Sequence, residues 1–323
     1  MARAAAEPLK RARWREFGAF FVFVIFFTVL SFALGPKFFS LNNFQNILNQ
    51  NMTIALLAVG STFVILTAGI DLSVGSVLAL SGVVLGWVMA QLLEGGMSPL
   101  AVVAASIAAG LGTGLLCGLT SGVLVARFRL PPFVATLGLM AVGRGLTRVV
   151  TKGMTFSQQP EAFHRLGQGL PPVALTLLVF AGAWITLRYT RFGRFVYAVG
   201  SNEKAARLSG VNVAGVKIMV YALSGLLAGL GGVLLTSRLQ SANALLGLGY
   251  ELNAIAAVVI GGTSLMGGKG SVLGTLLGVF IYGMIQNCLN LFGVDPFWQE
   301  VVIGGVVIAV VLLDYQLQRK PEL

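Results

Sequence analysis

The chain has 323 residues, of which 56% are hydrophobic and only 10% are charged. A soluble domain carries about 25% charged residues, so this composition excludes a soluble globular protein and indicates an integral membrane protein. The net charge of +11 would suggest nucleic acid binding in a soluble chain. Here the basic residues lie in polar segments between apolar runs, so we expect no nucleic acid partner. Cys117 and Cys288 lie inside apolar runs and indicate neither a disulfide nor a metal site.

The N-terminal part of the chain predicts a basic tail followed by a first membrane span. Residues 1–16 carry the basic charge, and we expect them in the cytoplasm. The apolar run over residues 17–34 is longer than the core of a signal peptide, which predicts an uncleaved span. Residues 38–51 are rich in asparagine and are predicted to form an outside loop, with one apolar face along the membrane interface.

Two features mark the next three predicted spans. The second span, over residues 52–67, ends in a glycine-rich break that holds Asp71 and Ser73, and the third span continues from there to residue 93. The fourth span covers residues 99–126, and its glycines recur every four residues, at Gly110, Gly114, Gly118 and Gly122. They share one helix face, a pattern typical of closely packed membrane helices. We expect this face to pack inside the chain or against a second copy.

Six further apolar runs predict spans, and the loop over residues 151–172 is predicted to lie outside. These runs cover residues 131–150, 173–187, 218–236, 252–265, 271–291 and 297–313. Ten spans place both termini on one side, which is cytoplasmic by the positive-inside rule. The same side holds all four basic clusters: the N-terminal tail, Arg127 with Arg129, residues 188–217, and Arg319 with Lys320. The sequence therefore predicts an all-α, polytopic transmembrane bundle of about ten spans. We expect residues 1–323 to form a single domain with cytoplasmic N- and C-termini.

Residues 188–217 form the one long polar island, with six basic residues and a single acidic residue, Glu203. This charge between two apolar runs predicts a cytoplasmic loop. Within it, the stretch from Ser201 to Gly210 predicts a short helix, because Ser201 or Asn202 can cap its first amides and Gly210 can end it. Ala205 and Leu208 share a face, with Ala206 beside them. We predict that this face docks on a soluble partner, with a charged rim made of Glu203, Lys204 and Arg207.

The chain holds no phosphate-binding loop, no metal-ligand cluster and no paired carboxylates of a proton relay. We therefore expect a transporter that needs an external motor. Asp71 is a candidate for the translocation gate, with a cap for the third span, assisted by Ser73, as the alternative. Arg144 is predicted to face a wet cavity or a partner, or else to extend to the outer surface.

Three segments, residues 64–76, 198–212 and 256–270, resemble the permease subunits of bacterial ribose-type ABC importers. The resemblance extends from Lys37 to Asp314. It implies a multi-pass protein of the bacterial inner (plasma) membrane that forms a translocation path for a monosaccharide. It also implies three partners: a cytoplasmic ATPase subunit that binds the ATP, a periplasmic or extracellular sugar-binding protein, and a second permease. We expect a homodimer, and the motifs do not separate it from a pair of paralogous permeases.

The family's coupling loop maps onto residues 200–213, which include the predicted short helix. The motifs do not separate ribose from xylose, arabinose, galactose or a signalling furanose. An ATP-independent channel or facilitator for small solutes is the alternative, and it would need no motor contact. A membrane enzyme is disfavoured because His, Asp and Glu are scarce.

Overall fold

The computed structural model describes residues 20–318 except 22 and 33, and the side chains of residues 313–318 are not described. The predicted basic tail over residues 1–16 and the cluster at Arg319 and Lys320 lie outside the described residues. Within the described part, the regular elements are helices and no strand is present. The prediction of an all-α membrane protein is confirmed at this level.

Seven helices are long and apolar enough to cross a membrane. They are α2 (Leu41–Leu66), α3 (Val74–Glu94), α4 (Pro99–Ala126), α5 (Pro132–Thr151), α7 (Leu170–Tyr189), α10 (Val213–Leu239) and α12 (Val272–Leu291). Three shorter apolar helical stretches cover Phe23–Phe32, Tyr250–Ile260 (α11) and Pro296–Leu312, the last within α13 (Pro296–Gln318). Each predicted span thus corresponds to a helical stretch among the described residues, and α13 as a whole has 23 residues.

The prediction of a full span over residues 252–265 is wrong. In the structure α11 has 11 residues, which is about 16 Å of helix and too short for a bilayer core of about 30 Å. Its end, Gly261, is followed by a glycine-rich loop in which Gly262, Gly267 and Gly268 have positive φ. The span was predicted from the apolar residues of 252–265, and hydropathy carries no information on the backbone turns that end the helix at Ile260.

Residues 38–51 do not form the predicted loop, because α2 begins at Leu41 and runs on without a break. Ser40 caps it by accepting a hydrogen bond from the Asn43 amide. The side chains of Asn43 and Asn287, on α12, exchange two hydrogen bonds of 3.0 and 2.8 Å. Because this buried pair satisfies the two side-chain amides, the polar first turns of α2 can pack against α12.

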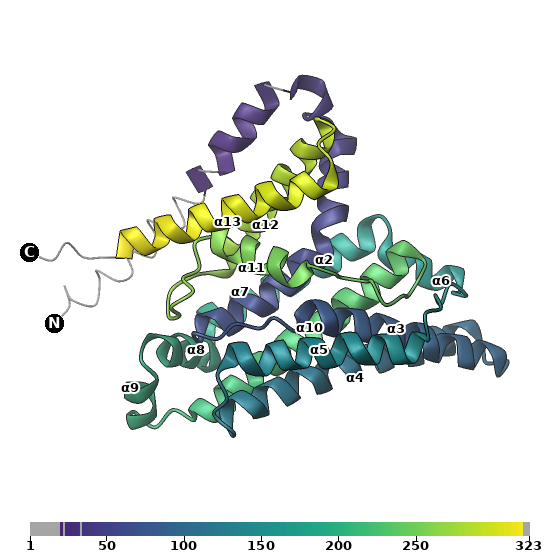
Figure 1. The fold of residues 1–323 in the computed structure, drawn as a ribbon, viewed down its shortest axis with the longest axis horizontal. Coiled ribbons are helices and arrows are strands. Elements are labelled where there is room, and N and C mark those ends of the chain that lie inside the picture. Colours follow the sequence, from purple (N-terminus) through teal and green to yellow (C-terminus); the bar gives the residue numbers. More distant parts are fainter. Residues whose placement is uncertain (1–19, 22, 33, 319–323) are drawn as a thin grey trace, which may run out of the picture.

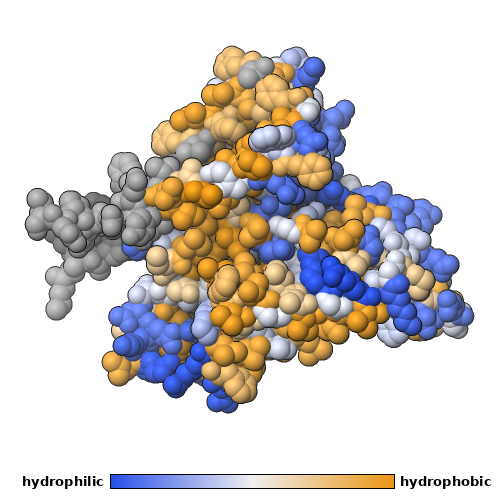
Figure 2. Space-filling model, viewed as in Figure 1, coloured by the Kyte–Doolittle hydropathy of each residue, from blue (hydrophilic) through white to orange (hydrophobic). Residues whose placement is uncertain are grey.

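The helices lie between two polar ends. Helices α3, α4, α5 and α10 run along the long axis of the molecule, with α8 (Arg191–Ser201) and α9 (Glu203–Leu208) at one end and α6 (Glu161–His164) at the other (Figure 1). Hydrophobic residues cover much of the middle of this face, and hydrophilic residues gather over both ends (Figure 2). This distribution suits a protein that crosses a bilayer along its long axis.

The glycine face of α4 lies against α10 of the same chain. A Cβ atom on Gly114 or Gly118 would collide with the α10 backbone at Gly225 and Tyr221, and one on Gly122 would lie 2.8 Å from the Ile218 Cα. A Cβ on Gly110 would instead meet α3, 3.2 Å from the Ser81 carbonyl oxygen. Because glycine has no side chain, the backbone of α4 can approach the backbones of α10 and α3 closely.

Candidate coupling and translocation site

The polar island contains two helices where the sequence predicted one. The first, α8, covers residues 191–200, which were predicted as loop. It is capped by Thr190, whose hydroxyl accepts a hydrogen bond from the Gly193 amide, and it buries Val196 and Val199 on its inner face. Ser201 ends α8 and does not cap the next helix. The alternation of arginines with aromatic and aliphatic residues was the signal for this amphipathic helix.

The short helix α9 spans Glu203–Leu208 inside the predicted stretch. Asn202 is its cap, since its side-chain oxygen accepts a 3.0 Å hydrogen bond from the Ala205 amide. Gly210 follows with a φ of +82°, the left-handed conformation that ends helices. Leu208 is 90% exposed, whereas Ala206 is buried in the core and does not join the outer face as the sequence suggested.

The charges of α9 are paired inside the chain. The Glu203 carboxylate accepts hydrogen bonds from Arg207 at 3.0 Å and from Lys217, on α10, at 2.7 Å. The hydrogen bond from Lys217 lowers the pKa of the Glu203 carboxyl below its ordinary value. Lys204 is exposed. The helix therefore presents an exposed leucine beside charges that α10 helps to hold in place.

The three segments that resemble permease motifs meet at this end of the bundle. The Gly268 amide donates a 2.9 Å hydrogen bond to the Leu66 carbonyl, and the Tyr197 hydroxyl donates one of 2.9 Å to the Gly270 carbonyl. A Cβ atom on Gly200 would collide with the Leu66 carbonyl and lie 2.7 Å from the Gly268 nitrogen. The end of α8 thus packs against the end of α2 and is hydrogen-bonded to the loop after α11. These contacts between distant segments could not be read from the spacing of residues.

Asp71 is buried in the break between α2 and α3, with 3% of its surface exposed. Its Oδ1 atom accepts hydrogen bonds from the Ser73 amide at 3.0 Å and from the Ser73 hydroxyl at 2.6 Å. Its Oδ2 atom accepts one of 2.9 Å from Ser224 on α10. The carboxylate therefore orders the break before α3 and ties it to α10, while the first turn of α3 receives no capping hydrogen bond from a side chain. A role of Asp71 in gating is a hypothesis.

Arg144, on α5, does not extend to the surface, because its side chain is only 14% exposed. Its two terminal nitrogens donate hydrogen bonds to the carbonyls of Leu246 and Gly247 at 2.7 and 2.8 Å. These carbonyls belong to the non-helical connection between α10 and α11. Such backbone is tolerated at membrane depth only where protein groups or water satisfy it. Arg144 supplies these hydrogen bonds, and it therefore has a partner inside the chain.

The sequence analysis missed Glu251, which lies on the first turn of α11 with its Oε2 atom 4.0 Å from the Arg144 guanidinium. The Glu251 side chain is 12% exposed. A Cβ atom on Gly75 would collide with Glu251 Oε2, so the glycine leaves room for the carboxylate. An acidic residue at the start of an apolar run was the available signal, and its pairing with Arg144 makes burial possible.

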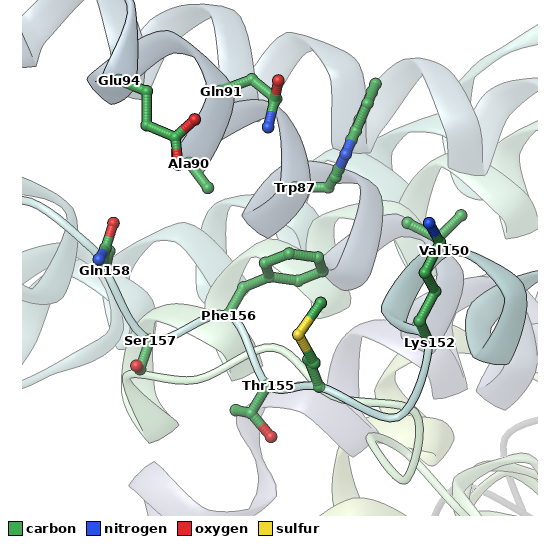
Figure 3. A pocket seen from close by; sticks show the side chains of 11 residues that line it. Trp87, Ala90, Gln91, Glu94, Val150, Lys152, Thr155, Phe156, Ser157 and Gln158 are labelled. Atoms are coloured by element: carbon green, nitrogen blue, oxygen red, sulfur yellow. The ribbon is translucent and has the colours of Figure 1, made fainter.

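A polar pocket of about 390 Å³ lies at the opposite end of the bundle from α9. One wall is a stripe on the last turns of α3, formed by Trp87, Gln91 and Glu94, and the other is the segment from Lys152 to Gln158 (Figure 3). Two hydrogen bonds of 2.9 Å between the backbones of Phe156 and Ala242 hold this segment in place. The lining mixes an indole, amides, hydroxyls and both signs of charge with the apolar side chains of Ala90, Val150, Met154 and Phe156.

A bundle of membrane-length apolar helices, with a capped, partly basic helix at one end and a polar pocket at the other, defines a polytopic membrane protein of the permease class. The chain belongs to the family described as branched-chain amino acid transport system / permease component, whose profile matches residues 43–311. It is thus a multi-pass protein of the inner membrane and a transport component.

Its relatives include several sugar permeases. The chain is 47% identical to the ribose import permease protein RbsC of Escherichia coli K12 over 295 residues, which cover 88% of this chain and 89% of the relative. It is 45% identical to RbsC of Bacillus subtilis over 301 residues (91% and 90%). It is 39% identical to the D-allose transport system permease protein AlsC of Escherichia coli K12 over 315 residues (95% and 93%). No solved structure matches the chain.

Proposed function

We propose that this chain is the membrane-spanning permease subunit of an ATP-driven ABC importer, and that its substrate is a monosaccharide, with ribose as the first candidate. The observation that carries the proposal is the 47% identity to a ribose import permease over 88% of the chain. The junction of the three motif segments at the α8–α9 end supports the same conclusion. ATP binds to the partner subunit, and this chain supplies the path and the coupling element.

We further infer that the chain is one domain of ten membrane-embedded helices with both termini in the cytoplasm. The loop after α11 contacts Ser201 at the α9 end, while α10 leads away from α9 towards the other end. The connection after α10 and the half-length α11 together return the chain across the membrane. The last turns of α13 lie at the α9 end in Figure 1, which agrees with a cytoplasmic C-terminus.

The proposed partners divide between the two ends. The coupling element comprises Ser201, Asn202, Glu203, Lys204, Ala205, Arg207, Leu208 and Gly210, and its helix α9 docks in a groove of the ATPase subunit through Leu208. A sugar-binding protein docks at the opposite end, near the polar pocket. A second permease copy completes the translocation path, and its contact lies away from the glycine face that α10 covers.

Uptake by proteoliposomes tests the proposed substrate class. The chain is reconstituted with the ATPase and the sugar-binding protein that co-purify with it, and uptake of labelled ribose is measured with ATP inside. We expect uptake that excess unlabelled ribose abolishes and that fructose and galactose reduce less. The proposed substrate class is wrong if no monosaccharide is taken up. It is also wrong if the proteoliposomes take up a different solute and no monosaccharide competes with that uptake.

A further inference from the structure

Helix α9 is joined to α10 by one strong side-chain contact. It has only six residues, and a helix this short has little stability of its own in water. The Glu203 carboxylate and the Lys217 ammonium are 2.7 Å apart, and the Lys217 side chain is 18% exposed. This pair is more shielded from solvent than the Glu203–Arg207 pair, whose arginine is 60% exposed, so it is less weakened by water and salt.

Lys217 begins a stripe of contacts along α10. Tyr221 and Ser224 follow it at four and seven residues, so the three side chains share one helix face. Tyr221 is buried, and its hydroxyl oxygen would lie 2.6 Å from a Cβ atom on Gly69. Ser224 donates its hydrogen bond to Asp71. This stripe, about 10 Å long, contacts α9 at one end and the break between α2 and α3 at the other.

We propose that this stripe transmits the movement of α9 to the break that holds Asp71, with Glu203 and Lys217 as positioning residues. The proposal rests on the docking of α9 to the ATPase proposed above. A helix is stiff along its axis, so a displacement at Lys217 reaches Ser224 with little loss. The ion pair makes α9 and α10 move together, and the Ser224–Asp71 hydrogen bond moves the break with them.

Charge reversal and exchange test the ion pair. The variants Glu203→Lys, Lys217→Glu and the double variant are reconstituted with the ATPase and the sugar-binding protein, and the sugar imported per ATP hydrolysed is measured. We expect each single variant to lower this ratio by about tenfold, within the usual range of coupling energies. The double variant restores the opposite charges and should recover the ratio to within about twofold of the original chain.

The exchange also separates coupling from docking. If Glu203 acted only through a charge on the ATPase, the double variant would keep the wrong charge on α9 and stay as impaired as Glu203→Lys. That result, or a normal ratio in both single variants, would overturn the proposal. Loss of α9 docking itself is detected separately, by pull-down of the ATPase subunit with each variant.

Two further variants guard against a simple folding defect. Ser224→Ala leaves α9 unaltered and removes only the hydrogen bond to Asp71; we expect it to lower the ratio while the ATPase subunit remains bound. A normal ratio in this variant would contradict transmission through Ser224. Thr186→Val is the control, because it removes only an exposed hydrogen bond of 2.7 Å within α7 and should leave the ratio unchanged.

Discussion

Leu208→Asp is expected to abolish sugar uptake while the protein still inserts in the membrane and remains folded. Leu208 is 90% exposed in the isolated chain, so the change removes no internal packing. In a groove of the ATPase, burial of this side chain would contribute about 1.5–3 kcal/mol, and a buried, unpaired carboxylate would cost more. We therefore expect the affinity for the ATPase subunit to fall at least tenfold, with loss of sugar-stimulated ATP hydrolysis.

The measurement is a pull-down of the ATPase subunit together with its sugar-stimulated hydrolysis in proteoliposomes. Leu208→Met is the matched control, since it keeps an apolar side chain of similar volume and should retain most activity. Full sugar-stimulated hydrolysis by correctly inserted Leu208→Asp protein would exclude α9 as the coupling element.

Gly114→Leu is expected to prevent the formation of folded permease. A side chain at this position would enter the backbone of α10 at Gly225 and Gly229, and backbone cannot move aside as a flexible side chain can. Overpacking typically costs about 1–3 kcal/mol, and contact with two glycines of a packed helix should reach or exceed the upper value. We expect little monodisperse protein after detergent extraction, and a strongly reduced Tm for what remains.

The same helix offers a control two residues away. A Cβ atom on Gly112 would have no neighbour within 4 Å, so Gly112→Leu should give folded protein in nearly normal yield. Size-exclusion chromatography of both variants is the measurement. Equal yields of the two would mean that the glycine face is not closely packed, whereas loss in both would point to a general intolerance of α4.

Local signals in the sequence were sufficient for the class of protein and for α9. The contrast between apolar runs and a basic island depends only on composition, and the cap at Asn202 and the stop at Gly210 act within one helix. The four-residue spacing of the glycines on α4 likewise places them on one helix face, and this holds whichever helix packs against that face. These features could be predicted because their physical causes lie within a few residues of each other.

The remaining features depend on partners far along the chain. The polar start of α2 is helical because Asn43 meets Asn287, 244 residues later. The buried arginine is satisfied by carbonyls 102 and 103 residues away, in a connection whose place between two apolar runs was predicted but whose contacts were not. The alternatives weighed for Arg144 were a wet cavity, a partner or the outer surface, and the partner that it has is a stretch of backbone that needed hydrogen bonds.

The dependence of sugar accumulation on ATP tests the central claim most directly. Labelled ribose is offered to proteoliposomes that contain the permease, its ATPase and its sugar-binding protein, with ATP or a non-hydrolysable analogue enclosed. An importer driven through α9 should accumulate sugar above the external concentration only with ATP. Equal entry in both preparations, ending at the external concentration, would instead identify an ATP-independent channel and contradict the proposed function.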